Sequence, residues 1–67
     1  MEKYPEITAR AIALADGVVR VAAELGISPA AVSRWLHVLE HVPVARCADI
    51  ERLSGIPRAQ LRPDIFG

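Results

Sequence analysis

Two histidines and one cysteine are the side chains of this sequence that most often bind metals or act as nucleophiles. His37 and His41 are four residues apart, which would place both on one face of a helix. A structural zinc site needs four ligands, and no third ligand accompanies this pair. Cys47 has no cysteine partner, and it falls on an apolar stripe, where a free cysteine usually behaves as a small hydrophobic residue. We therefore expect no metal site, no cofactor and no internal disulfide.

The sequence also contains no recognisable catalytic motif. It contains no glycine-rich phosphate loop and no set of Ser, His and Asp in a plausible order. A chain of 67 residues is one small domain, here residues 1–67, and leaves no room for a pocket-sized core. We predict a binding protein rather than an enzyme.

Charge and hydropathy limit the possible partners. Eight basic and eight acidic side chains give a net charge of zero, so no strong overall field attracts nucleic acid or an anionic membrane. Binding to nucleic acid would have to be local to one surface. Residues 1–5 lack a basic region followed by a long apolar run, and charged residues interrupt the apolar stretches elsewhere. These features predict a cytoplasmic protein with no membrane partner.

Helix signals occupy nearly the whole chain. Hydrophobic residues make up 52% of the sequence, 11 residues are alanine, and β-branched residues nowhere alternate with polar ones over more than a few positions. We therefore predict an all-α fold, a compact bundle of four to five helices.

Proline, serine and glycine mark the expected ends of these helices. The first should run from Pro5 to Asp16, with Gly17 as its left-handed closing residue. Its expected core stripe is Ile7, Ala11, Leu14 and Ala15. Further helices are expected over residues 18–25, about 28–38 and 43–54, followed by one turn at 58–61 that ends before Pro63 and an irregular tail at 64–67.

Residues 18–38 have the spacing of a helix-turn-helix motif. Gly26 supplies the turn, and the Ser28-Pro29 pair caps and opens the second helix. Ala22 lies where the two helices would cross closely, so a small side chain is needed there. The apolar residues expected to be buried beneath the motif are Val21, Leu25, Ile27, Val32 and Trp35.

Three segments of the chain resemble known regulators. Residues 21–36, VAAELGISPAAVSRWL, resemble the λ-repressor-like helix-turn-helix of phage Cro/CI-type proteins. Residues 42–55 and 61–66, VPVARCADIERLSG and LRPDIF, resemble the Cro-like, YdaS-type proteins of bacteria and prophages. The resemblance implies a DNA-binding domain that represses transcription from a phage or prophage operator in the bacterial host cell, often as a homodimer on double-stranded DNA. For YdaS-type systems it also implies the antitoxin-like member of a gene pair.

The chain departs from the family pattern at two positions. Such proteins usually carry glutamine just after the glycine that precedes the first helix of the motif, and again directly after the serine cap of the recognition helix. This chain has Val18 and Pro29 at those positions. Valine cannot hydrogen-bond a phosphate, and proline offers neither a base-edge donor nor an amide. Fewer direct contacts to DNA are therefore expected.

The remaining outer residues define a candidate surface for the major groove. Arg34 can pair bidentately with guanine, and Ala30 can contact a thymine methyl group. Ser33 suits a phosphate or either base, as does the amide-rich start of the helix, and Arg20 is the candidate anchor for the DNA backbone. The candidate DNA-binding residues are Arg20, Ser28, Pro29, Ala30, Ser33, Arg34 and His37.

Alternative interpretations remain open at this stage. Arg34 suits a phosphate or solvent as well as a base, and Ser28 is needed as a helix cap even in a protein that never meets DNA. The whole chain could instead be a helical module that binds a protein partner, with an unused DNA face. The zero net charge favours that alternative, because non-specific affinity for DNA depends on neutralised phosphates. For a homodimer, the candidate contacts are Leu39, Val42, Ile65 and Phe66.

Overall fold

The computed structural model describes residues 2–67, and all regular structure within this range is helical. Two non-α segments lie between the α-helices: a π-helical segment, Trp35–Leu39, continues α3, and a 3₁₀ turn, Val44–Arg46, leads into α4. The predicted all-α bundle is confirmed. The α-helices are α1 (Pro5–Leu14), α2 (Val18–Leu25), α3 (Pro29–Arg34), α4 (Cys47–Ser54), α5 (Arg58–Leu61) and α6 (Pro63–Phe66).

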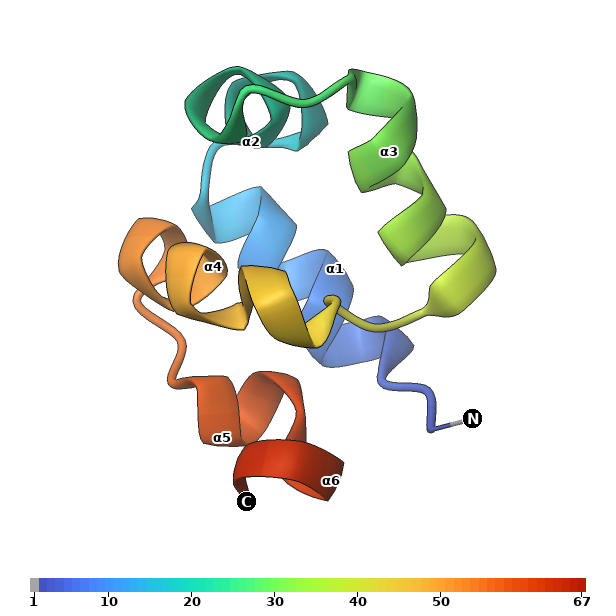
Figure 1. Ribbon diagram of the computed structural model, residues 1–67, viewed down its shortest axis with the longest axis vertical. Coiled ribbons are helices and arrows are strands. Elements are labelled where there is room, and N and C mark those ends of the chain that lie inside the picture. The colour runs from blue at the N-terminus through green and yellow to red at the C-terminus, as the bar shows by residue number, and fades with distance from the viewer. Residues whose placement is uncertain (1) are drawn as a thin grey trace.

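Helix α1 lies at the centre of the molecule. It contacts α2, α4, α5 and the π-helical segment. In Figure 1, α2 and the start of α3 lie above it, and α5 and α6 lie below it. Helices of four to ten residues are marginal in isolation, so the outer helices depend on packing: α2, α4 and α5 against α1, α3 against α2, and α6 against α5.

The buried stripe of α1 is rotated from its predicted position. The residues that face the core are Thr8, Ala11, Ile12 and Ala15. Leu14, which was predicted to be in the core, is 55% exposed, so that prediction is wrong. The four buried positions fill one side of the helix, and Leu14 lies beyond its edge. Small side chains at positions 11 and 15 let neighbouring helices approach closely.

The end of α1 also differs from the prediction. Asp16, with φ of 75°, is the left-handed residue that closes the helix, and its amide donates to the Ala13 carbonyl at 3.1 Å. The Gly17 amide completes the turn by donating to the Ile12 carbonyl at 2.8 Å. Gly17 itself has φ of 95° and ψ of 175°, a conformation that favours glycine, and it precedes α2 directly.

Helices α2 and α3 pack against each other around a tight turn. Helix α2 has the bounds predicted for it, and Gly26 closes it with a left-handed φ of 68°. The amide of Ile27 donates to the Ala22 carbonyl at 3.0 Å, which completes the closing turn. Ala22 is 1% exposed, and Val21 and Val32 are fully buried beside it. The helix-turn-helix arrangement therefore rests on a small side chain at position 22.

The C-terminal region has one more helix than the sequence predicts. Gly55 closes α4 with φ of 81°, and the turn predicted at 58–61 forms as α5. Pro63 was expected to end the regular structure, but it stands in the first turn of α6, so the prediction of an irregular tail is wrong. Proline suits this position because the first amides of a helix have no partner within the helix.

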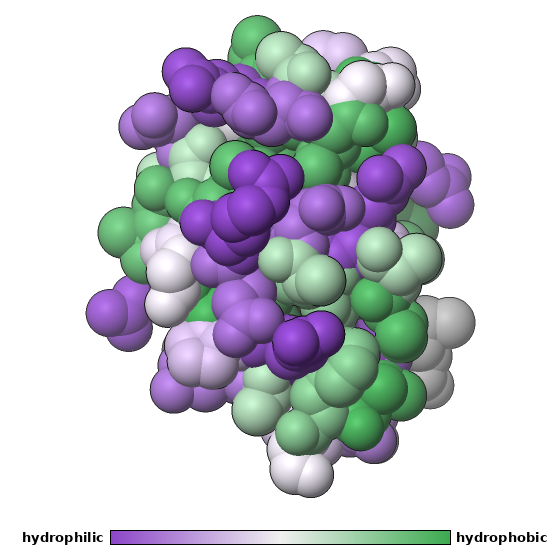
Figure 2. Space-filling model, turned by 60° about the vertical axis from the view of Figure 1, so that its left-hand side comes forward, coloured by the Kyte–Doolittle hydropathy of each residue, from purple (hydrophilic) through white to green (hydrophobic). Residues whose placement is uncertain are grey.

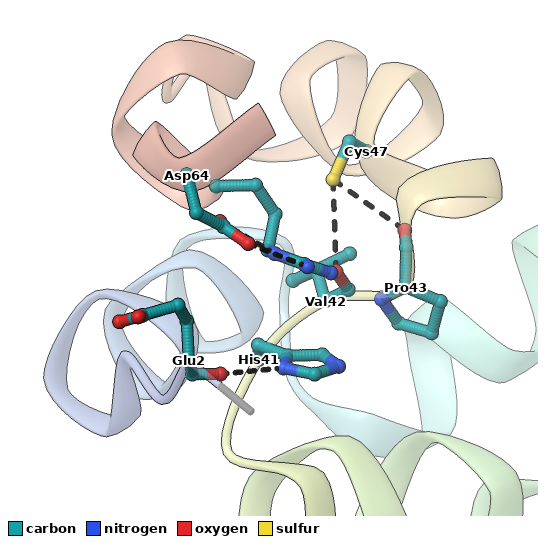
Figure 3. A network of polar contacts seen from close by, with 7 residues as sticks. Glu2, His41, Val42, Pro43, Cys47 and Asp64 are labelled. Atoms are coloured by element: carbon teal, nitrogen blue, oxygen red, sulfur yellow. Dashed lines mark hydrogen bonds and ion pairs between the residues drawn. The ribbon is translucent and has the colours of Figure 1, made fainter. Parts of the chain in front are cut away.

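A buried arginine joins this C-terminal region to the loop before α4. Arg62 is 7% exposed, and its Nη1 donates to the Val42 carbonyl at 3.0 Å. Its Nε and Nη2 donate to the two carboxylate oxygens of Asp64 at 3.0 and 2.9 Å (Figure 3). The Cys47 thiol also donates to the Pro43 carbonyl at 3.4 Å. All three nitrogens of the Arg62 guanidinium therefore donate to an oxygen of this chain.

The same loop also holds the N-terminal segment. His41 is 6% exposed, and its Nδ1 lies 2.9 Å from the Glu2 carbonyl oxygen (Figure 3). The Tyr4 amide donates to the Glu40 carbonyl at 2.6 Å. Val42 is fully buried in the hydrophobic core, so the prediction that it is exposed for a dimer contact is wrong. Of the other candidates, Leu39 and Phe66 are half-buried and Ile65 is 51% exposed.

Replacing Ala22 by leucine tests the close approach of α2 and α3. The larger side chain has no space at a position that is 1% exposed, so Ala22→Leu should lower the free energy of unfolding by about 1 to 3 kcal/mol. Ala23→Leu, at an exposed position of the same helix, is the matched control and should change it by less than about 0.5 kcal/mol. Chemical denaturation measures both. Overlapping curves for Ala22→Leu and the wild type would contradict the packing described.

The Arg62–Asp64 pair should make stability depend on pH in the acid range. The hydrogen bonds from Arg62 hold the pKa of the Asp64 carboxyl below its usual value. The stabilisation is therefore complete above a pH of about 4 and is lost as the pH falls through the lowered pKa of the folded state. Asp64→Asn should thus be less stable than the wild type at neutral pH, and the difference should shrink in acid.

The matched control for this test is Asp16→Asn. Asp16 makes no ion pair with any of residues 2–67, and asparagine tolerates its left-handed backbone conformation. Urea denaturation between neutral and acid pH compares the two variants. A gap between Asp64→Asn and the wild type that stays constant as the pH falls would show that the carboxylate charge is not what stabilises the C-terminal region.

Candidate nucleic-acid interface

The start of α3 is held by a cap that its sequence predicts. The Ser28 hydroxyl oxygen accepts a hydrogen bond from the Ala31 amide at 3.2 Å, and Pro29 occupies the first turn. The cap satisfies one of the amides left free at the helix start, and proline removes another. Ser28 is therefore a structural residue first, although its hydroxyl stays exposed and keeps its proton for a hydrogen bond to a ligand.

The outer face of α3 brings together most of the predicted DNA-binding residues. Ala30 and Arg34 are exposed, and Ser33 between them is half-buried. The spacing of three and four residues places these three side chains on adjacent parts of one helix surface. Pro29 is exposed at the start of this surface, and His37 is exposed on the π-helical segment that continues it. The opposite side of the helix carries Val32 and Trp35, which are buried in the core as predicted.

Arg20 lies apart from this group, on the exposed face of α2. Its Nε forms an ion pair with Oε1 of Glu24 at 3.0 Å, one helical turn further along. The Arg20 side chain is 60% exposed, so solvent and a phosphate can reach it. The cation predicted to anchor the DNA backbone is thus paired with a carboxylate in the free protein. The spacing of four residues between Arg20 and Glu24 was visible in the sequence and could have revealed this pair.

Ion pairing distinguishes Arg34 from most other basic residues of the chain. Within residues 2–67, six of the eight basic side chains are paired with carboxylates, and Arg10 and Arg34 are the two that are not. Hydrophilic and hydrophobic residues are intermixed on the face drawn in Figure 2. Arg34 is therefore an unpaired guanidinium on the outer face of a capped helix. Sequence reasoning did not single out Arg10, which is exposed on α1.

The side chains that could support other chemistry have structural partners instead. The Nδ1 atom of His41 lies at the Glu2 carbonyl, and His37 is exposed on the π-helical segment. Residues 2–67 contain no cluster of three metal-binding side chains. Cys47 is fully buried, and burial raises the pKa of its thiol, which keeps it in the unreactive protonated form. No helix in this range has the length and apolar character needed to cross a bilayer.

An open groove lies between the start of α1 and the C-terminal helices. Its volume is about 590 Å³, and its lining is largely apolar. It contains one ionisable carboxylate, Glu6, and no histidine or cysteine, so it lacks a set of groups for acid–base or nucleophilic catalysis. The lining residues are Tyr4, Pro5, Glu6, Ile7, Ala59, Gln60 and Pro63.

Comparison with known proteins confirms the YdaS-type resemblance. A relative from Escherichia coli strain K12, named "Putative transcriptional regulator YdaS", is 36% identical over 58 residues, which cover 84% of this chain. The match spans only 59% of that relative's length. No solved structure matches the chain significantly. The family model described as "Bacterial toxin YdaS" matches residues 8–67, nearly the whole chain, and the protein therefore belongs to the YdaS family.

Proposed function

We propose that this protein is a sequence-specific DNA-binding regulator that represses transcription from a phage or prophage operator. The observation that carries the proposal is the outer face of α3, where the unpaired Arg34 stands beside Ala30 and Ser33 on a capped helix. A guanidinium in this position can donate two hydrogen bonds to the major-groove edge of guanine. The name of the Escherichia coli relative, a transcriptional regulator, supports a regulatory role.

Binding as a pair of chains is part of the proposal. One recognition helix reads only a few base pairs, and a protein without net charge gains little affinity from phosphates. Two copies on a symmetric site would double both kinds of contact. The exposed Ile65, at the C-terminal end, is the best remaining candidate for a contact between the two copies.

The second candidate function is binding to a protein partner. It is favoured by the pairing of six basic side chains with carboxylates, which leaves little positive charge for phosphates. The description of the family model as a toxin also fits an effect on another macromolecule of the cell. The experiment that separates the candidates is a selection of genomic fragments at low salt, combined with recovery of bound proteins. An enriched DNA sequence supports the regulator, whereas a recovered protein without DNA enrichment supports the alternative.

Replacing Arg34 tests base recognition directly. On the selected fragment, Arg34→Ala should weaken binding by about 1 to 3 kcal/mol and should relax the preference at one base position. The matched control is Arg52→Ala, which removes an exposed arginine from α4 and should leave the base preference unchanged. Repeating the selection with each variant measures the preference. Equal losses for the two variants would mean that Arg34 contributes only charge.

The number of chains on the DNA tests the proposed pairing. We expect two chains on one symmetric fragment, with half-sites about 34 Å apart on the same side of the duplex, and weak or no self-association without DNA. Sedimentation of the complex measures the stoichiometry. A strict one-to-one complex on the best selected fragment would contradict the paired arrangement.

A further inference from the structure

The ion pair between Arg20 and Glu24 has features that helix stability does not explain. Glu24 is the penultimate residue of α2, where a negative charge opposes the helix dipole. The order of the pair, with arginine before glutamate at a spacing of four, is also the less favourable one. The Arg20 side chain is 60% exposed and the Glu24 side chain 36%, so solvent weakens their attraction further. A stabilising role for Glu24 within α2 is therefore small.

The position of Glu24 within the motif suggests a different role. It is the single acidic residue in residues 18–38, and it binds one of the two arginines of that segment. The other arginine, Arg34, makes no ion pair with any of residues 2–67. The motif thus presents one free guanidinium on α3 and one neutralised guanidinium on α2. A phosphate that binds Arg20 must first replace the Glu24 carboxylate.

We propose that Glu24 competes with DNA phosphate for Arg20 and thereby suppresses binding to DNA of the wrong sequence. This inference rests on the proposed function, because it requires that the motif binds DNA. Each phosphate neutralised by a protein cation releases counterions, and this release drives non-specific binding. A cation that already has a carboxylate partner brings less of this gain, because the ion pair must be broken first. On the correct sequence, contacts made by α3 hold the helix in place and favour the exchange of Glu24 for phosphate.

Replacing Glu24 by glutamine tests the competition. Glutamine has a similar shape and helix propensity but no charge, so Arg20 is released while α2 is retained. On a duplex of scrambled sequence, Glu24→Gln should bind about twofold more tightly, because an exposed ion pair at this spacing is weak. The plot of log affinity against log salt should steepen, by at most about 0.9 for one additional phosphate contact. On the selected fragment the affinity should also rise, because the ion pair no longer has to be broken, but the salt slope should stay the same, because Arg20 already binds phosphate in the wild-type complex. Fluorescence anisotropy between about 50 and 200 mM salt measures both duplexes.

Two further variants show whether the effect passes through Arg20. Glu51→Gln removes the same charge from the ion pair with Arg58 on the C-terminal side of the molecule, and it should change neither the affinity nor the slope by as much. In the Arg20→Ala background, adding Glu24→Gln should have no further effect. Thermal denaturation confirms that all variants are folded.

The outcomes separate this inference from the proposed function. If the wild type binds its selected fragment but Glu24→Gln behaves like Glu51→Gln, the competition is wrong and the regulator remains. If Glu24→Gln tightens binding equally with and without Arg20, Glu24 repels DNA directly and the competition is again wrong. If no variant binds any duplex, both the competition and the proposed function are wrong.

Discussion

The packing of short helices around α1 is the constraint on which the rest of the structure depends. Helices of four to ten residues do not persist on their own in water. They form here because α1 packs against α2, α4 and α5, while α3 packs against α2 and α6 against α5. Several helices can pack closely against α1 because its buried face includes Ala11 and Ala15, which have small side chains. Ala22 has the same role between α2 and α3. The candidate DNA-binding surface is thus held in place by residues that never touch a ligand.

Polar groups complete the packing where the apolar core is too small to do so. Burying the Arg62 guanidinium is costly unless its hydrogen bonds are satisfied, and here it binds both the Val42 carbonyl and Asp64. The loop that these bonds hold connects the π-helical segment after α3 to α4, and its His41 also contacts the N-terminal segment. Polar contacts of this one loop therefore link the π-helical segment, the N-terminal segment and the last helix.

The distribution of charge connects this architecture to the proposed function. Most basic side chains are engaged by carboxylates of the same chain, so electrostatic attraction to DNA of any sequence is weak. Under the proposed function, affinity for DNA would come from contacts that depend on shape and base identity, made by a rigid helix face. The cap at Ser28 and the buried Trp35 supply that rigidity on either end of α3.

Local signals in the sequence determined the helix-turn-helix segment almost completely. The bounds of α2, the turn at Gly26 and the cap at Ser28 all follow from residues within a few positions of one another, since glycine conformation and capping are local properties. The same local signals placed Arg20 and Arg34 on exposed faces. They also predicted the buried Trp35 through its spacing from Val32.

Only the tertiary structure decided which residues meet across longer distances. The exposure of Leu14 depends on how α1 is rotated against its neighbours. The loop at Val42 and the final helix α6 are joined by Arg62, which binds Val42, 20 residues away, and Asp64, two residues away. The hydrophobic pattern shows how wide the apolar face of a helix is, but packing against neighbouring helices decides which residues lie at the middle of the buried face. Arg62 reads as a surface charge in the sequence because charged residues are seldom buried, and only its hydrogen-bond partners in the fold make its burial possible.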